Sequence, residues 1–254
     1  MSALLSLSGV HTHIGAYHIL HGVDFEVPAG EVTMLLGRNG AGKTTTLRTI
    51  MGLWSASQGR IVFDGSRIGG PAEAAGRGES PRTPEIARLG IAYVPENMGI
   101  FADLTVRENM LLAARQAKSA AELDSTRLEW LFALFPALKK FWLYPAGKLS
   151  GGQKQMLAIA RAMVEPRRLL LIDEPSKGLA PAIVQNLIAA LRELKSTATT
   201  VLLVEQNFAV AKALGDTVAV MDDGRVVHRG AMAELAADEG LQHKLLGLSL
   251  AAHH

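Results

Sequence analysis

The sequence predicts an α/β fold with a mainly parallel sheet, and three observations support this prediction. Short apolar runs at 32–36, 169–172, 201–204 and 218–221 have the length of strands buried on both faces. A helical pattern at 182–195 lies between two of these runs, as in strands joined by crossover helices. The stretch GRNGAGKT directly follows the first run and precedes a helical pattern at 44–51. We therefore expect a strand, a phosphate-binding loop and a helix in succession.

The N-terminal part predicts a separate antiparallel β subdomain. Strand patterns at 4–10 and 18–27 precede the turn signal Pro28-Ala29-Gly30, and another strand at 60–63 is closed by Asp64-Gly65. The following segment, 69–84, is rich in glycine, proline and alanine. Such a composition does not support a packed element, so we expect 69–84 to be a flexible surface insertion.

The middle of the chain predicts an inserted α-helical subdomain. Thr105 with Glu108 and Ser150 with Gln153 form capping boxes ahead of helical patterns, and Pro136 interrupts the helix between them. We expect a single domain over 1–254. Its core and β subdomain occupy 1–101 and 166–254, and its helical subdomain occupies about 102–165.

The bulk composition narrows the class of protein. Lysine and arginine total 26 against 24 acidic residues, a balance that gives no indication of nucleic-acid binding. The absence of cysteine excludes a disulfide framework and thiolate metal sites. We also expect no secretory signal, and no run approaches the roughly 20 apolar residues of a membrane span.

The stretch at 37–44 satisfies the pattern G-x-x-x-x-G-K-[S/T]. Its glycines let backbone amides approach phosphate oxygens, and the following helix adds the positive end of its dipole. We expect Lys43 to meet the β- and γ-phosphates and the Thr44 hydroxyl to meet Mg²⁺. A chance glycine turn is the alternative, but the position between strand and helix favours a triphosphate site. Its predicted binding residues are Gly37, Arg38, Asn39, Gly40, Ala41, Gly42, Lys43, Thr44 and Thr45.

Two carboxylates follow the apolar run at 169–172. Asp173 and Glu174 are then placed at the carboxyl end of a buried strand, where ligands bind in open α/β sheets. We expect Asp173 to hold Mg²⁺ and Glu174 to polarise the water that attacks the γ-phosphate. On their own, two acidic residues after an apolar run indicate only a strand that enters a solvated turn. The phosphate loop upstream favours a catalytic role for them in a P-loop NTPase core.

Leu149-Ser150-Gly151-Gly152-Gln153 begins a capped helix whose N-terminus leaves room for an anion. The stretch closely resembles the LSGGQ signature of ABC ATPases. The resemblance implies that Ser150, Gly151, Gly152 and Gln153 bind ATP held by the phosphate loop of a second ATPase subunit, an identical copy or a paralogue. It also implies ATP hydrolysis coupled to transport.

Departures from the general ABC pattern resemble the LivF-type ATPases of branched-chain amino acid, urea and amide importers. Glu96 stands at the place of a glutamine that meets Mg²⁺ or water, Ala180 at the place of an aspartate, and Gln206 at that of the catalytic switch histidine. The resemblance implies transmembrane permease partners and, indirectly, an external solute-binding protein. It places the chain in the cytoplasm, peripheral to the inner face of the membrane.

Two alternatives remain open. A soluble ABC ATPase acting on nucleic acid or ribosomes usually carries linked ATPase domains or a long coiled coil, and a small-molecule kinase would have no use for the signature helix.

Within the family, adenine usually stacks on an aromatic residue where this chain has Ile14, so Tyr17 or His13 is a candidate substitute. The clustered histidines near them are interpreted as a hairpin surface.

Overall fold

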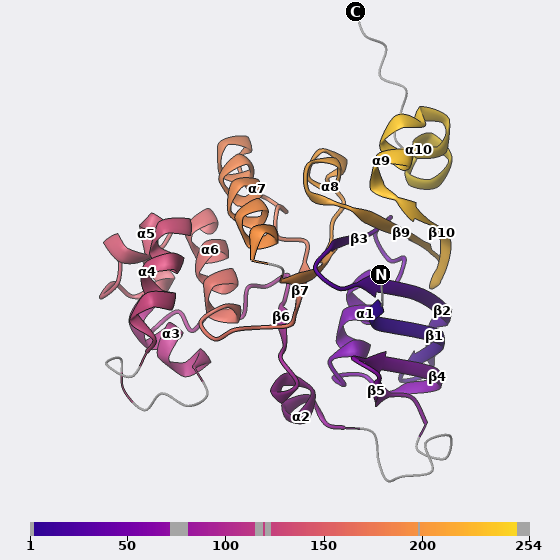
Figure 1. Cartoon of the computed structure of the whole chain (residues 1–254), viewed down its shortest axis with the longest axis horizontal. Coiled ribbons are helices and arrows are strands. Elements are labelled where there is room, and N and C mark those ends of the chain that lie inside the picture. The colour runs from indigo at the N-terminus through magenta and orange to yellow at the C-terminus, as the bar shows by residue number, and fades with distance from the viewer. Residues whose placement is uncertain (1–2, 72–80, 115–118, 120–122, 198, 248–254) are drawn as a thin grey trace, which may run out of the picture.

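The computed structural model describes residues 3–71, 81–114, 119, 123–197 and 199–247. Within them the N-terminal strands form an antiparallel sheet in the order β2-β1-β4-β5. Its members are β1 (Ala3–Ile14), β2 (Tyr17–Pro28), β4 (Ala56–Phe63) and β5 (Ser66–Gly69). The predicted antiparallel β subdomain is therefore present (Figure 1).

The second sheet has the order β10-β9-β3-β8-β7-β6. Strands β9, β3, β8, β7 and β6 run parallel, and β10 pairs antiparallel with β9. The strands are β3 (Val32–Gly37), β6 (Ile91–Val94), β7 (Leu169–Asp173), β8 (Thr200–Val204), β9 (Thr217–Asp222) and β10 (Arg225–Ala231). Because β3, β7 and β8 are parallel neighbours, their carboxyl ends lie at one edge of the sheet.

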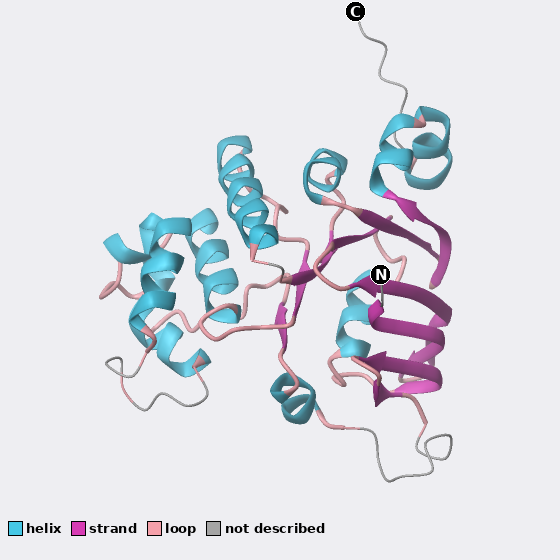
Figure 2. Ribbon diagram, in the orientation of Figure 1, coloured by secondary structure: helices cyan, strands magenta, loops and turns pink. Residues whose placement is uncertain are grey.

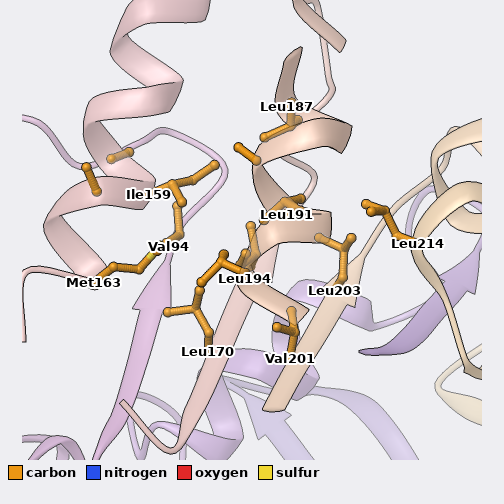
Figure 3. Close-up of a cluster of buried hydrophobic side chains, with 14 of the residues drawn as sticks. Val94, Ile159, Met163, Leu170, Leu187, Leu191, Leu194, Val201, Leu203 and Leu214 are labelled. Atoms are coloured by element: carbon orange, nitrogen blue, oxygen red, sulfur yellow. The ribbon is translucent and has the colours of Figure 1, made fainter. Parts of the chain in front are cut away.

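Alternate residues of each central strand enter two separate cores. In β7, Leu170 and Ile172 pack with helices α6 (Gly151–Ala162) and α7 (Pro181–Ser196), as Figure 3 shows for part of this cluster. Leu169 and Leu171 face the other way, toward helix α1 (Lys43–Ile50) and the antiparallel sheet. This two-sided burial explains why the strands are continuous apolar runs.

The inserted helices form a lobe beside the sheet, on the left in Figures 1 and 2. They are α3 (Val106–Ala113), α4 (Ser125–Leu134), α5 (Pro136–Lys140), a short 3₁₀ turn (Ala146–Lys148) and α6. Both predicted capping boxes are confirmed, at Thr105 for α3 and Ser150 for α6. The interruption at Pro136 is also confirmed, because α4 ends at Leu134 and α5 begins at Pro136.

The expectation of an unpacked insertion at 69–84 is wrong at both ends. Gly69 is the last residue of β5 and pairs with Ile61 of β4. Helix α2 (Thr83–Arg88) begins within the segment, because proline suits the first turn of a helix and Ile86 is buried in the core. Residues 72–80 lie outside the described chain.

Three of the described helices follow β8 in the C-terminal part. Helix α8 (Phe208–Leu214) follows β8, and α9 (Met232–Ala237) and α10 (Glu239–Leu246) follow β10. Within the described residues, no helix combines the length and the apolar character that crossing a bilayer requires.

Candidate functional site

The phosphate loop connects β3 to α1 through backbone conformations that favour glycine. Gly37, Gly40 and Gly42 have φ of +145°, +81° and +99°. A Cβ at Gly37 would lie 2.2 Å from the carbonyl oxygen of Met221, and a Cβ at Gly42 would lie 2.9 Å from Leu20. Packing therefore excludes a side chain at Gly37, where the neighbour is backbone, whereas at Gly42 the Leu20 side chain would have to move.

The Lys43 ammonium is buried above this loop. Its Nζ donates hydrogen bonds to the carbonyl oxygens of Gly37 at 2.7 Å and Arg38 at 2.9 Å, and lies 3.8 Å from Glu174 Oε1. Burial lowers the pKa of Lys43, while the carboxylates of Glu174 and Asp173 oppose that shift. The loop thus holds a cation ready for an anionic ligand.

Asp173 ends β7 and is completely buried. Its Oδ1 accepts a hydrogen bond from Thr44 Oγ1 at 3.1 Å, and its Oδ2 accepts one from Tyr93 Oη at 3.2 Å. Burial raises the pKa of Asp173, against which these two hydroxyl groups act. Burial, together with the charge of Asp173, raises the pKa of Tyr93 to about 12, so this phenol is a hydrogen-bond donor at neutral pH.

Glu174 leaves β7 in a left-handed conformation, with φ of +47°, which is uncommon for a non-glycine residue. Its Oε1 accepts a hydrogen bond from Gln206 Nε2, which also donates to Asn39 Oδ1 of the phosphate loop. Its buried Oε2 accepts no hydrogen bond and lies 3.4 Å from Lys177 Nζ. The structure therefore brings Glu174, Gln206 and the phosphate loop together.

Glu174 and Glu96 line one cavity, in which Glu96 forms an ion pair with Lys177 at 2.6 Å. The cavity has a volume of about 370 Å³. Its lining comes from the hairpin, the phosphate loop and the strand ends: Ile19, Asn39, Gly40, Gly42, Lys43, Thr44, Thr45, Glu96, Glu174 and Lys177. Three loop residues of the predicted set do not line it: Arg38 is exposed, and Gly37 and Ala41 are buried.

Ser150–Gln153 do not line this cavity. They open α6, which lies on the opposite side of β6 and β7 from α1 (Figure 1). Ser150 and Gly151 are exposed, and a Cβ at Gly151 would meet no atom within 4 Å. Gly152 is buried, and a Cβ there would lie 2.5 Å from Ile183. The chain thus carries a phosphate loop and an open helix N-terminus at separate places.

Sequence reasoning missed two side chains of the site. Lys177 neutralises Glu96 and Glu174, and Tyr93 supports Asp173, although both lie in stretches already singled out. The roles of Lys177 and Tyr93 become visible only in the structure, where residues at the ends of separate strands come into contact.

The candidates for base contact lie on the β1–β2 hairpin. Tyr17 is 75% exposed and pairs with Ile14 across the strands, whereas the imidazoles of His13 and His18 stack with their centroids 4.1 Å apart. In the described chain, no group of three or more His, Cys, Asp or Glu residues is arranged to hold a metal ion.

Comparison with known sequences finds a matching family profile and similar named proteins. The family profile described as "ABC transporter" matches residues 20–177. BraG of Pseudomonas aeruginosa, a high-affinity branched-chain amino acid transport ATP-binding protein, is 37% identical over 244 residues, covering 96% of this chain and 100% of BraG. LivF of Archaeoglobus fulgidus, a probable branched-chain amino acid transport ATP-binding protein, is 34% identical over 232 residues, covering 91% of this chain and 93% of LivF.

Solved structures agree with the sequence comparison. An ATP-binding subunit of an ABC transporter is 31% identical with a TM-score of 0.74, covering 97% of this chain and 96% of that one. An ATP-binding cassette in its ADP conformation is 26% identical with a TM-score of 0.76, covering 98% and 100%. The predicted fold class is confirmed: a P-loop core with a mostly parallel sheet and an antiparallel N-terminal sheet.

Proposed function

This chain belongs to the ABC transporter family, and from that premise we propose that it powers an importer of branched-chain amino acids or related urea and small amides. As an ABC ATPase it binds and hydrolyses ATP. The names of BraG and LivF support the cargo class. The observation that carries the proposed chemistry is the arrangement around Glu174, whose Oε1 lies 3.8 Å from Lys43 Nζ and accepts a hydrogen bond from Gln206 Nε2.

Glu174 is the proposed general base. Its Oε2 has no hydrogen bond within the described structure, so it has the capacity to accept one from an attacking water. Its Oε1 is oriented by the Gln206 amide, which also reaches the phosphate loop through Asn39. Gln206 is neutral, so we assign it orientation of the base and the γ-phosphate by hydrogen bonding rather than by charge.

Thr44 and Asp173 are the proposed Mg²⁺ ligands, with Glu96 as an outer partner. The hydroxyl and carboxylate oxygens lie 3.1 Å apart and belong to the ligand type that Mg²⁺ prefers. A single buried carboxylate with a hydroxyl suits Mg²⁺ that completes its shell with phosphate oxygens and water. Held there by Thr44 and Asp173, Mg²⁺ would supply positive charge that offsets the charge of the phosphates. Glu96 reaches this position only if its ion pair with Lys177 opens.

A second ATPase subunit and transmembrane permeases complete the proposed assembly. Ser150 and Gly151 are exposed and lie apart from the cavity, which supports their use by the phosphates of a facing subunit. Permeases would hold the assembly at the inner face of the cell membrane, in contact with an external solute-binding protein. The stretch at 101–109, between Glu96 and the signature helix, is the proposed permease contact.

The variant Glu174→Gln tests the assigned chemistry. We expect its steady-state kcat for ATP hydrolysis to fall at least about a hundredfold, because general-base catalysis contributes roughly 10²–10⁴. Binding of a fluorescent ATP analogue stays within about threefold of wild type, because Lys43 and the loop are intact. Glu129→Gln, an exposed residue paired with Lys139, is the control and keeps full activity. Unchanged hydrolysis in Glu174→Gln would refute the mechanism.

The same variant tests the cargo in cells. A strain in which the chromosomal copy carries Glu174→Gln should lose high-affinity uptake of labelled leucine, isoleucine or valine, or of urea or a short amide. Uptake of the remaining solutes serves as the internal control. Normal uptake of every one of these solutes, with hydrolysis abolished in the purified variant, would retain the ATPase and reject this cargo class.

A further inference from the structure

Glu205 is a buried carboxylate that no motif explains. It follows β8 directly and is 2% exposed. Its Oε1 accepts a hydrogen bond from the Ser176 amide at 3.0 Å, and its Oε2 accepts one from the Ser176 hydroxyl at 2.8 Å. Oε2 also accepts from the backbone amides of Gln206 at 3.2 Å and Asn207 at 3.3 Å. All of these donors are neutral.

These bonds join two loops that are far apart in the sequence. Ser176 lies two residues after Glu174 in the loop that follows β7, and Gln206 lies in the loop that follows β8. The side chains of Glu174 and Gln206 meet on the other side of this junction. One carboxylate therefore fixes the backbone beside each of the two proposed catalytic residues.

The energetics favour a positional role for this carboxylate. Burial raises the pKa of Glu205, while its hydrogen bonds from Ser176 and the two backbone amides lower it. A buried charge without a cation is expensive, and an apolar side chain of similar size is often cheaper for stability. Glu174 also has a left-handed backbone, which persists only where the surrounding contacts hold it. Ser176 supplies such an anchor immediately after the strained residue.

We propose that Glu205 is a positioning residue for ATP hydrolysis, which locks the loops after β7 and β8 together and thereby holds Glu174 and Gln206 in register. This inference rests on the proposed roles of those two residues. Glu205 itself touches neither the phosphate loop's Lys43 nor the proposed Mg²⁺ ligands in its hydrogen bonds. Its loss should therefore affect the rate of hydrolysis more than the binding of nucleotide.

Glu205→Gln is the sharpest test, because it keeps the shape and removes one acceptor oxygen. Whichever way the amide is turned, its NH₂ group faces at least one backbone N–H of Ser176, Gln206 or Asn207. In the purified full-length chain we expect kcat to fall about 10- to 100-fold, a loss typical of small displacements of catalytic groups. KM for ATP should stay within about threefold.

Amide hydrogen exchange measures the junction without relying on catalysis. In nucleotide-free Glu205→Gln, exchange should accelerate about tenfold or more in both loops, at Ser176 and at Gln206 with Asn207. Ser176→Ala should give the same pattern more weakly, since the amide of residue 176 still donates. The double variant should lose little more than Glu205→Gln alone, because both changes break one network.

Asp216→Asn is the matched control for loss of a structural carboxylate. Asp216 accepts from the Val32 amide at 2.9 Å and pairs with Lys195, at the end of β3 away from the phosphate loop. Its removal should lower the unfolding midpoint but leave kcat within about twofold. An equal loss of kcat in this control, or unchanged kcat and loop exchange in Glu205→Gln, overturns the inference. Absence of hydrolysis in the wild-type chain instead contradicts the proposed function. The exchange result still tests whether Glu205 holds the two loops together.

Discussion

At the scale of single residues, Gly37 shows how strictly the phosphate loop is constrained. Gly37→Ala would place Cβ 2.2 Å from the carbonyl oxygen of Met221, at φ of +145°. A backbone carbonyl in a sheet has little freedom to move, so we expect a loss of about 3 kcal/mol in unfolding free energy. Urea unfolding of the purified chain measures this loss.

Gly40→Ala is the matched control within the same loop. Gly40 has φ of +81°, but a Cβ there meets no atom within 4 Å. Only the backbone penalty of about 1 kcal/mol applies. If both variants unfold at the same urea concentration, steric conflict with Met221 does not determine the choice of glycine at position 37.

The proposed active-site residues were predictable from the sequence to different degrees. Lys43, Thr44, Asp173 and Glu174 were predicted because their order along strand, loop and helix reflects local geometry. Glu205 was not, because a glutamate after an apolar run is ordinarily a solvated residue. Its burial depends on donors of Ser176, which lies 29 positions away in the sequence. Such long-range pairing leaves no local pattern.

At the scale of elements, the same distinction separates the strands that were predicted from those that were missed. Strands β7 and β8 are buried on both faces and appear as continuous apolar runs. Strand β10, with the sequence RVVHRGA, has no fully buried residue and exists through its pairing with β9. Strand β6 (Ile91–Val94) includes the partly exposed Tyr93 and is likewise defined by its pairing, in this case with β7.

Helix α3 allows a prediction about how its start is held. Asn109 is fully buried, and its amide bonds the N–H and C=O of Phe101 and the carbonyls of Leu104 and Thr105. Asn109→Ala leaves the Phe101 N–H without this acceptor and removes the side-chain bond from three carbonyls that keep their backbone donors, so it should cost about 2–3 kcal/mol. Thr105→Ala removes only the helix cap and should cost about 1 kcal/mol. Urea midpoints measure both variants.

Leu112→Ala provides the control in the same helix. Leu112 is 59% exposed, and alanine favours helix, so its unfolding free energy should stay within about 0.5 kcal/mol of wild type. A loss for Thr105→Ala as large as that for Asn109→Ala would mean that the cap, rather than the buried amide network, holds the entry to α3.

At the scale of the whole molecule, the fold separates two features that both suit phosphate. The phosphate loop lies at the carboxyl edge of the parallel sheet, and the open N-terminus of α6 lies beyond β6 and β7 (Figure 1). Within one chain, the phosphate loop and the N-terminus of α6 do not line the same cavity. In the proposed dimer, two chains facing each other would satisfy both at once, since each loop would then meet the other's helix.

This arrangement predicts that dimer formation depends on ATP and on Gly151. Glu174→Gln with ATP and Mg²⁺ should elute as a dimer in size-exclusion chromatography with light scattering, and as a monomer without nucleotide. Adding Gly151→Asp places a negative charge at an exposed helix N-terminus where a facing phosphate would bind, so the ATP-dependent dimer should be lost. Folding should be unaffected, because a Cβ at Gly151 meets no atom within 4 Å.

The equivalent change Gly240→Asp, in the first turn of α10, should leave the dimer intact. A dimer that persists in Glu174→Gln with Gly151→Asp, at wild-type thermal stability, would show that the signature helix does not contact the partner's nucleotide.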